Sequence, residues 1–239
     1  MTETPSPPQK QRENVFLSLI LNIALPALIL IKGADWLGVG PAAVLIIGLS
    51  FPLSYGVWDF VRRKKINMFS GIGFVSVLLT GGIGLLKLPP EWIAIKEAAV
   101  PLAFGIAVLA TAKTPKPLVK LFLFNDEIFD TEKLTAALHD QNRQGDFDRL
   151  LYQCTLWVAG SFGLSAILNF ILAKIIVRSP GGSEAFNQEI GALAVWSFPV
   201  IVLPCMIVLM IALFKLFKGL HLMTGLPLED FMRNPPPKK

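Results

Sequence analysis

Six long apolar stretches constrain this chain more than any other feature of its sequence. A helix needs about 20 predominantly apolar residues to cross the roughly 30 Å hydrocarbon core of a bilayer. Each stretch is apolar throughout rather than alternating, which is typical of membrane helices and not of membrane strands. The sequence therefore predicts an all-α, polytopic membrane protein built as a six-helix bundle, with spans at Val15–Ile31, Pro41–Val61, Ile66–Leu86, Ile93–Ala112, Tyr152–Val177 and Ala192–Phe214.

The composition agrees with this fold class. Of the 239 residues, 53% are hydrophobic and 16% are charged, whereas a soluble domain carries about 25% charged residues. This balance excludes a soluble globular enzyme. The net charge of +5 is carried by loops between the apolar stretches, so the expected partner is the lipid bilayer and not a nucleic acid.

The distribution of Lys and Arg predicts the orientation of the helices. Seventeen of the 22 basic residues fall in the two tails and in the loops after the second and fourth spans. Basic residues are enriched in cytoplasmic loops. Both termini are therefore expected in the cytoplasm, in agreement with an even number of spans. All five tryptophans lie near expected span ends, at Trp36, Trp58, Trp92, Trp157 and Trp196.

The same pattern divides the chain into five parts. The expected parts are a disordered cytoplasmic tail (1–14), the first four helices (15–112), a cytoplasmic amphipathic segment (113–151), the last two helices (152–214) and a second cytoplasmic tail (215–239).

The 113–151 segment has helical signals of its own. Residues 116–124 combine Lys with Leu and Phe, as an interfacial helix does. Asp130 is predicted to cap a helix that runs through Gln144, with Gly145 as its stop and Asp146 as the next N-cap. The segment is either a strap on the membrane or a docking surface for a cytoplasmic partner.

An internal repeat links the two ends of the chain. Leu17–Asn22 recurs as Leu164–Asn169, and Ser50-Phe51-Pro52 recurs at the same offset of 147 as Ser197-Phe198-Pro199. The repeat predicts that helices 1–2 and 5–6 are parallel hairpins related by an axis along the membrane normal. Some transporters are built in this way, although duplicated hairpins also form structural bundles.

Neutral polar residues are the candidates for a site within the membrane. The candidate cavity residues are Asn22, Asn169, Ser18, Ser165, Ser50 and Ser197. Four prolines are expected to break helices and free backbone carbonyls at similar depth: Pro26, Pro52, Pro199 and Pro204. The alternative is that these small and hydroxyl residues simply allow helices to pack closely.

Catalytic chemistry has little support in the sequence. Asp59 is the only carboxylate well inside a stretch, and Arg62 and Arg63 follow it at ion-pair spacing. His139 and His221 have no partners at metal-ligand spacing, and two isolated cysteines, Cys154 and Cys205, are typical of small buried side chains. We expect no enzyme activity, catalytic residue, metal or cofactor.

Several segments resemble the bacterial intracellular septation protein A family. They are Trp58–Ile66 after the second span, Gly81–Leu86 in the third, Lys96–Pro101 and Lys113–Leu118 around the fourth, Leu168–Phe170 in the fifth and Glu184–Asn187 before the last. The resemblance implies a multi-pass protein of the bacterial inner membrane that serves cell-envelope maintenance and septation, without catalytic residues.

Two functions follow as expectations. The first is a non-enzymatic membrane scaffold in the envelope, with a homo-oligomer or other envelope membrane proteins as partners. The alternative is a small-solute or lipid transporter built on the parallel repeat.

Overall fold

A computed structural model describes residues 20–63, 68–114, 117–119 and 130–225 of the chain. Within these residues the secondary structure is helical, with no strand. The chain forms two compact units: one combines residues 1–90 with 176–195, and the other combines residues 91–175 with 196–239. We describe each unit by itself.

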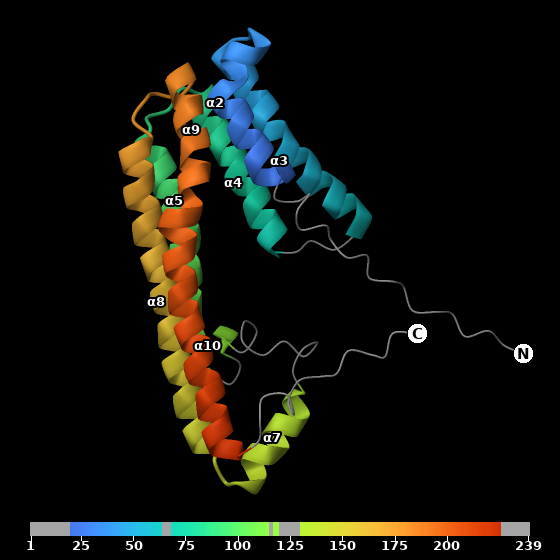
Figure 1. The fold of residues 1–239 in the computed structure, drawn as a ribbon, viewed down its shortest axis with the longest axis vertical. Coiled ribbons are helices and arrows are strands. Elements are labelled where there is room, and N and C mark those ends of the chain that lie inside the picture. The colour runs from blue at the N-terminus through green and yellow to red at the C-terminus, as the bar shows by residue number, and fades with distance from the viewer. Residues whose placement is uncertain (1–19, 64–67, 115–116, 120–129, 226–239) are drawn as a thin grey trace, which may run out of the picture. The chain divides into compact units, whose positions relative to one another are not determined.

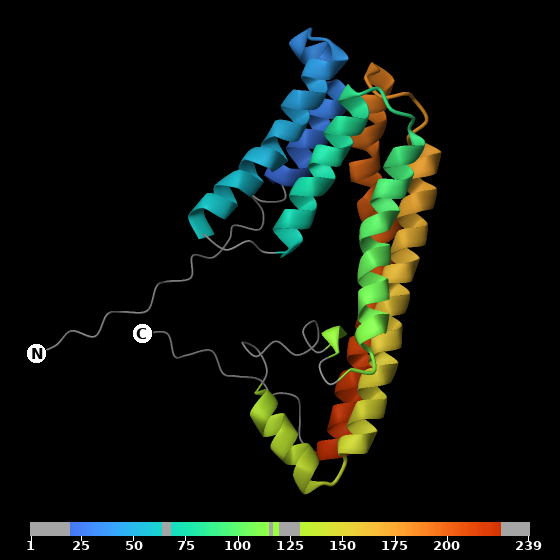
Figure 2. The same cartoon turned by 180° about the vertical axis from the view of Figure 1, so that it is seen from behind.

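The first unit contains the helices at the start of the chain. They are the π-helical turn η1 (Ile20–Ala24) and the α-helices α2 (Leu25–Leu37), α3 (Pro41–Arg63) and α4 (Met68–Leu85), joined by the beginning of α9 (Glu184–Ser197). α2 and α3 form a hairpin (Figures 1 and 2). Gly38 ends α2 with a φ of 63°, a left-handed conformation that glycine adopts at little cost.

The first unit is closely packed where α9 meets the other helices. Phe186, on the first turn of α9, has no exposed surface. A Cβ at Gly191 would lie 2.9 Å from the carbonyl oxygen of Ala27, so α9 and α2 approach as closely as glycine permits. Val44, Leu45 and Ile83 complete the buried apolar part of this contact region.

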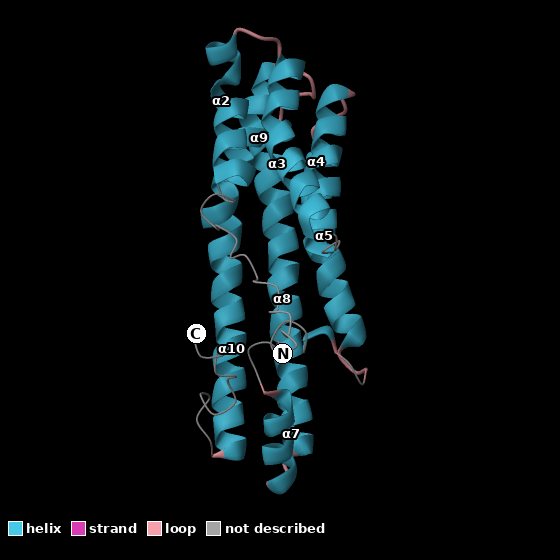
Figure 3. Ribbon diagram, turned by 90° about the vertical axis from the view of Figure 1, so that its right-hand side faces the viewer, coloured by secondary structure: helices cyan, strands magenta, loops and turns pink. Residues whose placement is uncertain are grey.

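The second unit is a layer of three long helices with a shorter one at the base. α5 (Glu91–Thr111), α8 (Gln144–Ile176) and α10 (Leu203–Thr224) run side by side, and α7 (Thr131–Asp140) lies near the end of α10 (Figures 1 and 3). A second π-helical turn, η2 (Phe198–Val202), leads into α10. The core of this unit contains Val108, Val119, Leu134, Leu138, Leu151, Cys154, Val158, Ala159, Ala212, Leu216 and Leu220.

Five helical segments of the described residues are long and apolar enough to cross a membrane. They are Ile20–Leu37, Pro41–Trp58, Glu91–Thr111, Gln144–Ile176 and Glu184–Thr224. The chain is therefore a multi-pass membrane protein by length and composition. The third expected span, Ile66–Leu86, corresponds to α4, which covers Met68–Leu85. Its 18 residues extend about 27 Å at 1.5 Å per residue, close to the thickness of the hydrocarbon core.

The last two spans are longer than the sequence predicted. α8 begins at Gln144, eight residues before Tyr152, and the final helical segment runs from Glu184 to Thr224 instead of from Ala192 to Phe214. The apolar stretches are shorter than these helices, because the polar ends of the helices are also packed against other residues. Leu151, Leu216 and Leu220 are buried beyond or near the ends of the expected spans.

The 113–151 segment confirms one capping prediction and corrects the next. The side chain of Asp130 accepts a hydrogen bond of 3.0 Å from the backbone N–H of Lys133 at the start of α7. However, α7 ends at Asp140, and Gly145 and Asp146 lie inside the first turn of α8. The turn is made instead by Asn142, which has a φ of 51°, because asparagine tolerates the left-handed region. Of the predicted interfacial helix at 116–124, only residues 117–119 are among those described.

Candidate functional site

A cavity in the first unit contains two of the residues predicted from the sequence. Asn22 of η1 and Pro52 of α3 line a space of about 280 Å³, together with Tyr55, Gly56, Gly73, Phe74 and Val77. The cavity therefore lies between η1, α3 and α4. A Cβ added at Gly73 would meet no atom within 4 Å, so this side of the cavity is open space next to a backbone.

The backbone at Asn22 is unusual. Asn22 is the central residue of the π-helical turn Ile20–Ala24, and Pro26 follows at the start of α2. Proline has no N–H for the carbonyl four residues earlier, which here belongs to Asn22. A π-helical turn changes the hydrogen-bonding register by one residue, and such turns are frequent at functional sites.

Two further cavities adjoin the same part of α3. One of about 430 Å³ is lined by Leu21, Ser50, Phe51, Ser54, Tyr55 and Trp58. The other, of about 490 Å³, is lined by Leu53, Ser54, Val57, Trp58, Val61 and Phe74. Trp58 lines both spaces and Tyr55 lines the first, and the centroids of their rings are 5.9 Å apart. The linings are mainly apolar with a few hydroxyl groups, and both spaces are open at the surface of the unit.

The remaining predicted cavity residues lie elsewhere. Asn169 and Ser165, both in α8, bond to each other: the Asn169 amide donates to the Ser165 carbonyl at 2.8 Å and to its hydroxyl at 3.2 Å. Ser197 ends α9 in the second unit. Ser18 lies outside the described residues.

The two copies of the predicted repeat differ in local backbone. Asn22 lies in a π-helical turn, whereas its counterpart Asn169 lies within the α-helix α8. Conversely, α3 continues through Pro52, whereas Pro199 lies in η2. There the backbone N–H of Leu203 donates to the carbonyl of Phe198, five residues earlier, directly before Pro204. The four prolines therefore act differently: Pro52 leaves its helix continuous, while Pro26 and Pro204 each follow a π-helical turn.

In the second unit a polar contact joins the middle of α8 to the first turn of α10. The hydroxyl of Ser161 on α8 donates to the carbonyl of Cys205 on α10 at 3.1 Å, and the Cys205 thiol lies 3.6 Å from the carbonyl of Ser161. This reciprocal pair ties the two helices together and satisfies both side chains. The arrangement is one of helix packing.

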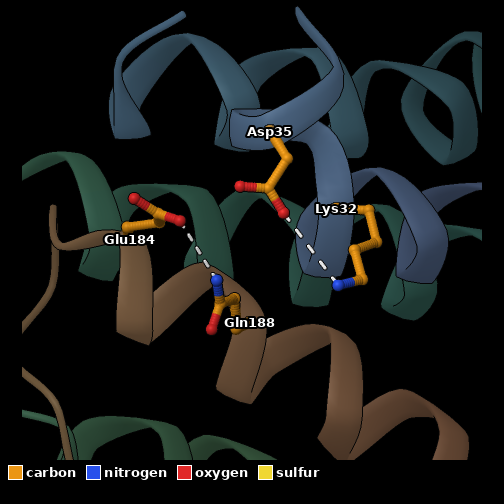
Figure 4. A network of polar contacts seen from close by, with 4 residues as sticks. All are labelled: Lys32, Asp35, Glu184 and Gln188. Atoms are coloured by element: carbon orange, nitrogen blue, oxygen red, sulfur yellow. Dashed lines mark hydrogen bonds and ion pairs between the residues drawn. The ribbon is translucent and has the colours of Figure 1, made fainter. Parts of the chain in front are cut away.

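The polar end of the first unit is held by hydrogen bonds from several segments. The carboxylate of Glu189 accepts from the backbone N–H groups of Arg178 and Ser179 at 3.0 and 2.9 Å, and from the Ser179 hydroxyl at 2.9 Å. Lys32 and Asp35 pair on α2 at 3.9 Å, and Gln188 donates to Glu184 on α9 at 3.1 Å (Figure 4). The Glu189 bonds secure the segment between α8 and α9, whereas the other two contacts each lie within one helix.

An ion pair is partly buried near the start of α5. The Lys96 Nζ lies 2.7 Å from a carboxylate oxygen of Glu97, and the Lys96 side chain is 7% exposed. Its ammonium group is buried beside its counter-charge, as a buried cation requires. The side chain of Asp59 is outside the described residues.

Sequence reasoning missed Tyr55 and Gly73 in the cavity region. Tyr55 is a hydroxyl-bearing side chain inside an apolar stretch, which was a usable signal. Gly73 gave no such signal, because a glycine beside open space resembles any other glycine in a membrane helix. Within the described ranges, no three His, Cys, Asp or Glu side chains gather as they would around a metal ion.

Comparison of the chain with family models, with curated proteins and with solved structures finds no match.

Proposed function

We propose that this chain is a non-enzymatic, multi-pass protein of the bacterial inner membrane, folded as a six-helix bundle with both termini in the cytoplasm. It would serve as a scaffold in cell-envelope maintenance and septation, and bind copies of itself or other envelope membrane proteins. The assignment to the envelope rests on the resemblance to the septation protein A family. The scaffold role rests on how the polar side chains in the helices are used.

Among the described residues, several of these side chains direct their hydrogen bonds to their own helix. The hydroxyls of Thr80, Thr111, Thr155 and Thr224 each donate to a carbonyl four residues earlier, at 2.8 to 3.1 Å. Asn169 does the same through its amide. Such bonds direct the donor groups to the backbone of the same helix and satisfy them in an apolar medium. This use of polar groups is the observation that carries the scaffold proposal.

A double substitution separates the scaffold from the transporter. In the scaffold, Asn22→Leu combined with Asn169→Leu mainly impairs folding or assembly, measured by thermal unfolding and by the oligomeric state of the purified chain. In a transporter, the same variant remains folded and assembled but loses uptake, efflux or lipid movement. A variant that is folded, assembled and active in every assay contradicts both roles for these residues.

The cavity at Asn22 favours a second candidate function, the binding of a lipid chain or small apolar solute. Its lining combines the Asn22 amide and Tyr55 with apolar side chains. A phospholipid with a photoreactive acyl chain is a direct probe. We expect cross-linking to Tyr55 or Phe74 in the wild-type protein.

Filling the cavity tests this second candidate. Gly73→Leu places a side chain in open space, and Gly82→Leu on the same helix is a matched control, because a Cβ there also meets no atom within 4 Å. Gly82 lines none of the three cavities described above. If the site binds lipid chains, only Gly73→Leu loses the cross-links. Equal cross-linking in both variants excludes this cavity as the site.

A further inference from the structure

A lysine and a tryptophan meet on the surface of the second unit, where α8 lies beside α10. The Nζ of Lys215 on α10 lies 4.8 Å from the centroid of the Trp157 ring on α8. Trp157 is 37% exposed, and Lys215 is exposed as well. A cation at this distance from an indole face is attracted by the ring. The contact therefore keeps the Lys215 ammonium group at the position of Trp157 along the two helices.

The opposite end of α8 indicates which level this is. There the Nζ of Lys174 lies 6.0 Å from the centroid of the Phe170 ring. Trp157 and Lys174 are 17 residues apart, which is about 25 Å along an α-helix. This length is close to the thickness of a bilayer's hydrocarbon core. The two pairs therefore mark the two boundaries of that core on α8.

The surface of α10 independently places a boundary at the same level. Before Lys215, its large exposed side chains are apolar: Met206, Ile207, Met210, Ile211 and Phe214. Lys215 is followed by Lys218, which is also exposed and lies one turn further on the same side of the helix. No acidic residue occurs between Leu203 and Thr224. The helix thus changes from apolar to cationic where the headgroup layer begins.

We propose that Trp157, Lys215 and Lys218 form a binding site for the phosphate-bearing headgroup of an anionic phospholipid. Two ammonium groups at headgroup depth complement a negatively charged lipid surface, and the amphipathic indole is suited to the same layer. The site requires the membrane insertion proposed above but neither the scaffold role nor the orientation of the termini.

Native mass spectrometry of the purified full-length chain tests this site. Phosphatidylglycerol is titrated against the wild-type protein and against Lys215→Gln/Lys218→Gln, with zwitterionic phosphatidylcholine as the neutral lipid. One lysine near an anionic lipid surface raises the binding affinity roughly fivefold. We therefore expect the double variant to bind phosphatidylglycerol about 25-fold more weakly, with little change for phosphatidylcholine.

Two matched variants make the result specific. Lys174→Gln/Arg178→Gln removes two charges near the other end of α8 and should leave phosphatidylglycerol binding largely intact. Lys215→Arg/Lys218→Arg keeps both charges and should also retain this binding. Lys218→Gln alone should show about a fivefold loss, so the test does not depend on the folding of one variant.

Three results would overturn the proposal. The first is equal phosphatidylglycerol affinity in wild type, in Lys215→Gln/Lys218→Gln and in Lys218→Gln. The second is an equal loss when the charges at 174 and 178 are removed, because binding would then follow net charge alone. The third is displacement of the lipid by millimolar inorganic phosphate, which would indicate a site for the free anion. Each of these readouts is independent of any envelope phenotype.

Discussion

The side chain of Asn187 joins the start of α9 to the first residue of α3: its Nδ2 donates a hydrogen bond of 2.7 Å to the carbonyl oxygen of Pro41. The two residues are 146 positions apart in the chain. Asn187 is 1% exposed, and its Oδ1 is a buried acceptor without a hydrogen-bond partner. Burying an amide with one unused acceptor costs folding free energy. The hydrogen bond to the Pro41 carbonyl is the contact that favours a buried asparagine at this position.

We expect Asn187→Leu to destabilise the first unit. The substitution removes the donor and leaves the Pro41 carbonyl without this bond, a loss of about 1–3 kcal/mol in the free energy of unfolding. Thermal unfolding of the purified protein measures it. Gln188→Leu is the control, because Gln188 is exposed and bonds only locally to Glu184. Equal melting temperatures for Asn187→Leu and wild type would contradict the assigned role.

Gly191→Ala should also destabilise the protein, through the close approach of α9 to α2. The new methyl group would lie 2.9 Å from the Ala27 carbonyl oxygen and 2.7 Å from Cγ1 of Ile31. A backbone carbonyl cannot easily move away, so we expect a loss of about 1–3 kcal/mol in unfolding free energy.

The control for Gly191 has the opposite expected sign. A Cβ at Gly160 in α8 would meet no atom within 4 Å. Alanine is a better helix former than glycine by up to about 1 kcal/mol, so Gly160→Ala should be neutral or stabilising in the same unfolding assay. Similar destabilisation by both alanines would show that the contact at Gly191 is not the cause.

Glu189→Ala should loosen the connection between α8 and α9. The carboxylate accepts two backbone N–H groups, of Arg178 and Ser179. Without it, hydrogen exchange at these two amides should become faster by about tenfold, as expected for a loss of roughly 1.4 kcal/mol. Glu184→Ala, which removes only the exposed bond to Gln188, should leave these amides unchanged. Unaltered exchange in Glu189→Ala would refute the tether.

The capping bond of Asp130 predicts a local effect on α7. Asp130→Ala removes the acceptor for the Lys133 N–H and should cost about 1 kcal/mol of helix stability. Faster proteolysis between residues 131 and 140 is the expected readout. Asp140→Ala removes a negative charge from the last turn of the same helix and should slow that cleavage slightly. Identical cleavage rates in the two variants would contradict the capping role.

Helix positions agree with the sequence where the signals are local. The expected spans Pro41–Val61 and Ile93–Ala112 correspond closely to α3 and α5, because apolarity and helix-ending residues act over neighbouring positions. The prediction was less successful at Glu184–Asn187, which lies before the last expected span, Ala192–Phe214. These residues form the first turn of α9, where Phe186 and Asn187 are buried. A Cβ at Gly84 would lie 3.0 Å from the Phe186 ring, so the glycine leaves room for this ring.

The candidate site was predictable in part. Asn22, Pro52 and Ser50 were chosen as polar or helix-breaking residues within apolar stretches, and all three line cavities. Asn169 and Ser165 had the same sequence signal but bond to each other within α8. Tyr55 and Gly73 complete the cavity beside Asn22, and their role depends on where the packing of η1, α3 and α4 leaves space.

The sequence by itself determined that this chain is helical and suited to a membrane, because a bilayer core demands long apolar segments whose backbone groups bond internally. It also determined the start of α7 through the cap at Asp130. Only the tertiary structure decided which polar groups meet, as Asn187 meets Pro41 and Ser161 meets Cys205. Such contacts depend on how closely and at what level helices approach one another, and these distances depend on side chains from segments far apart in the chain.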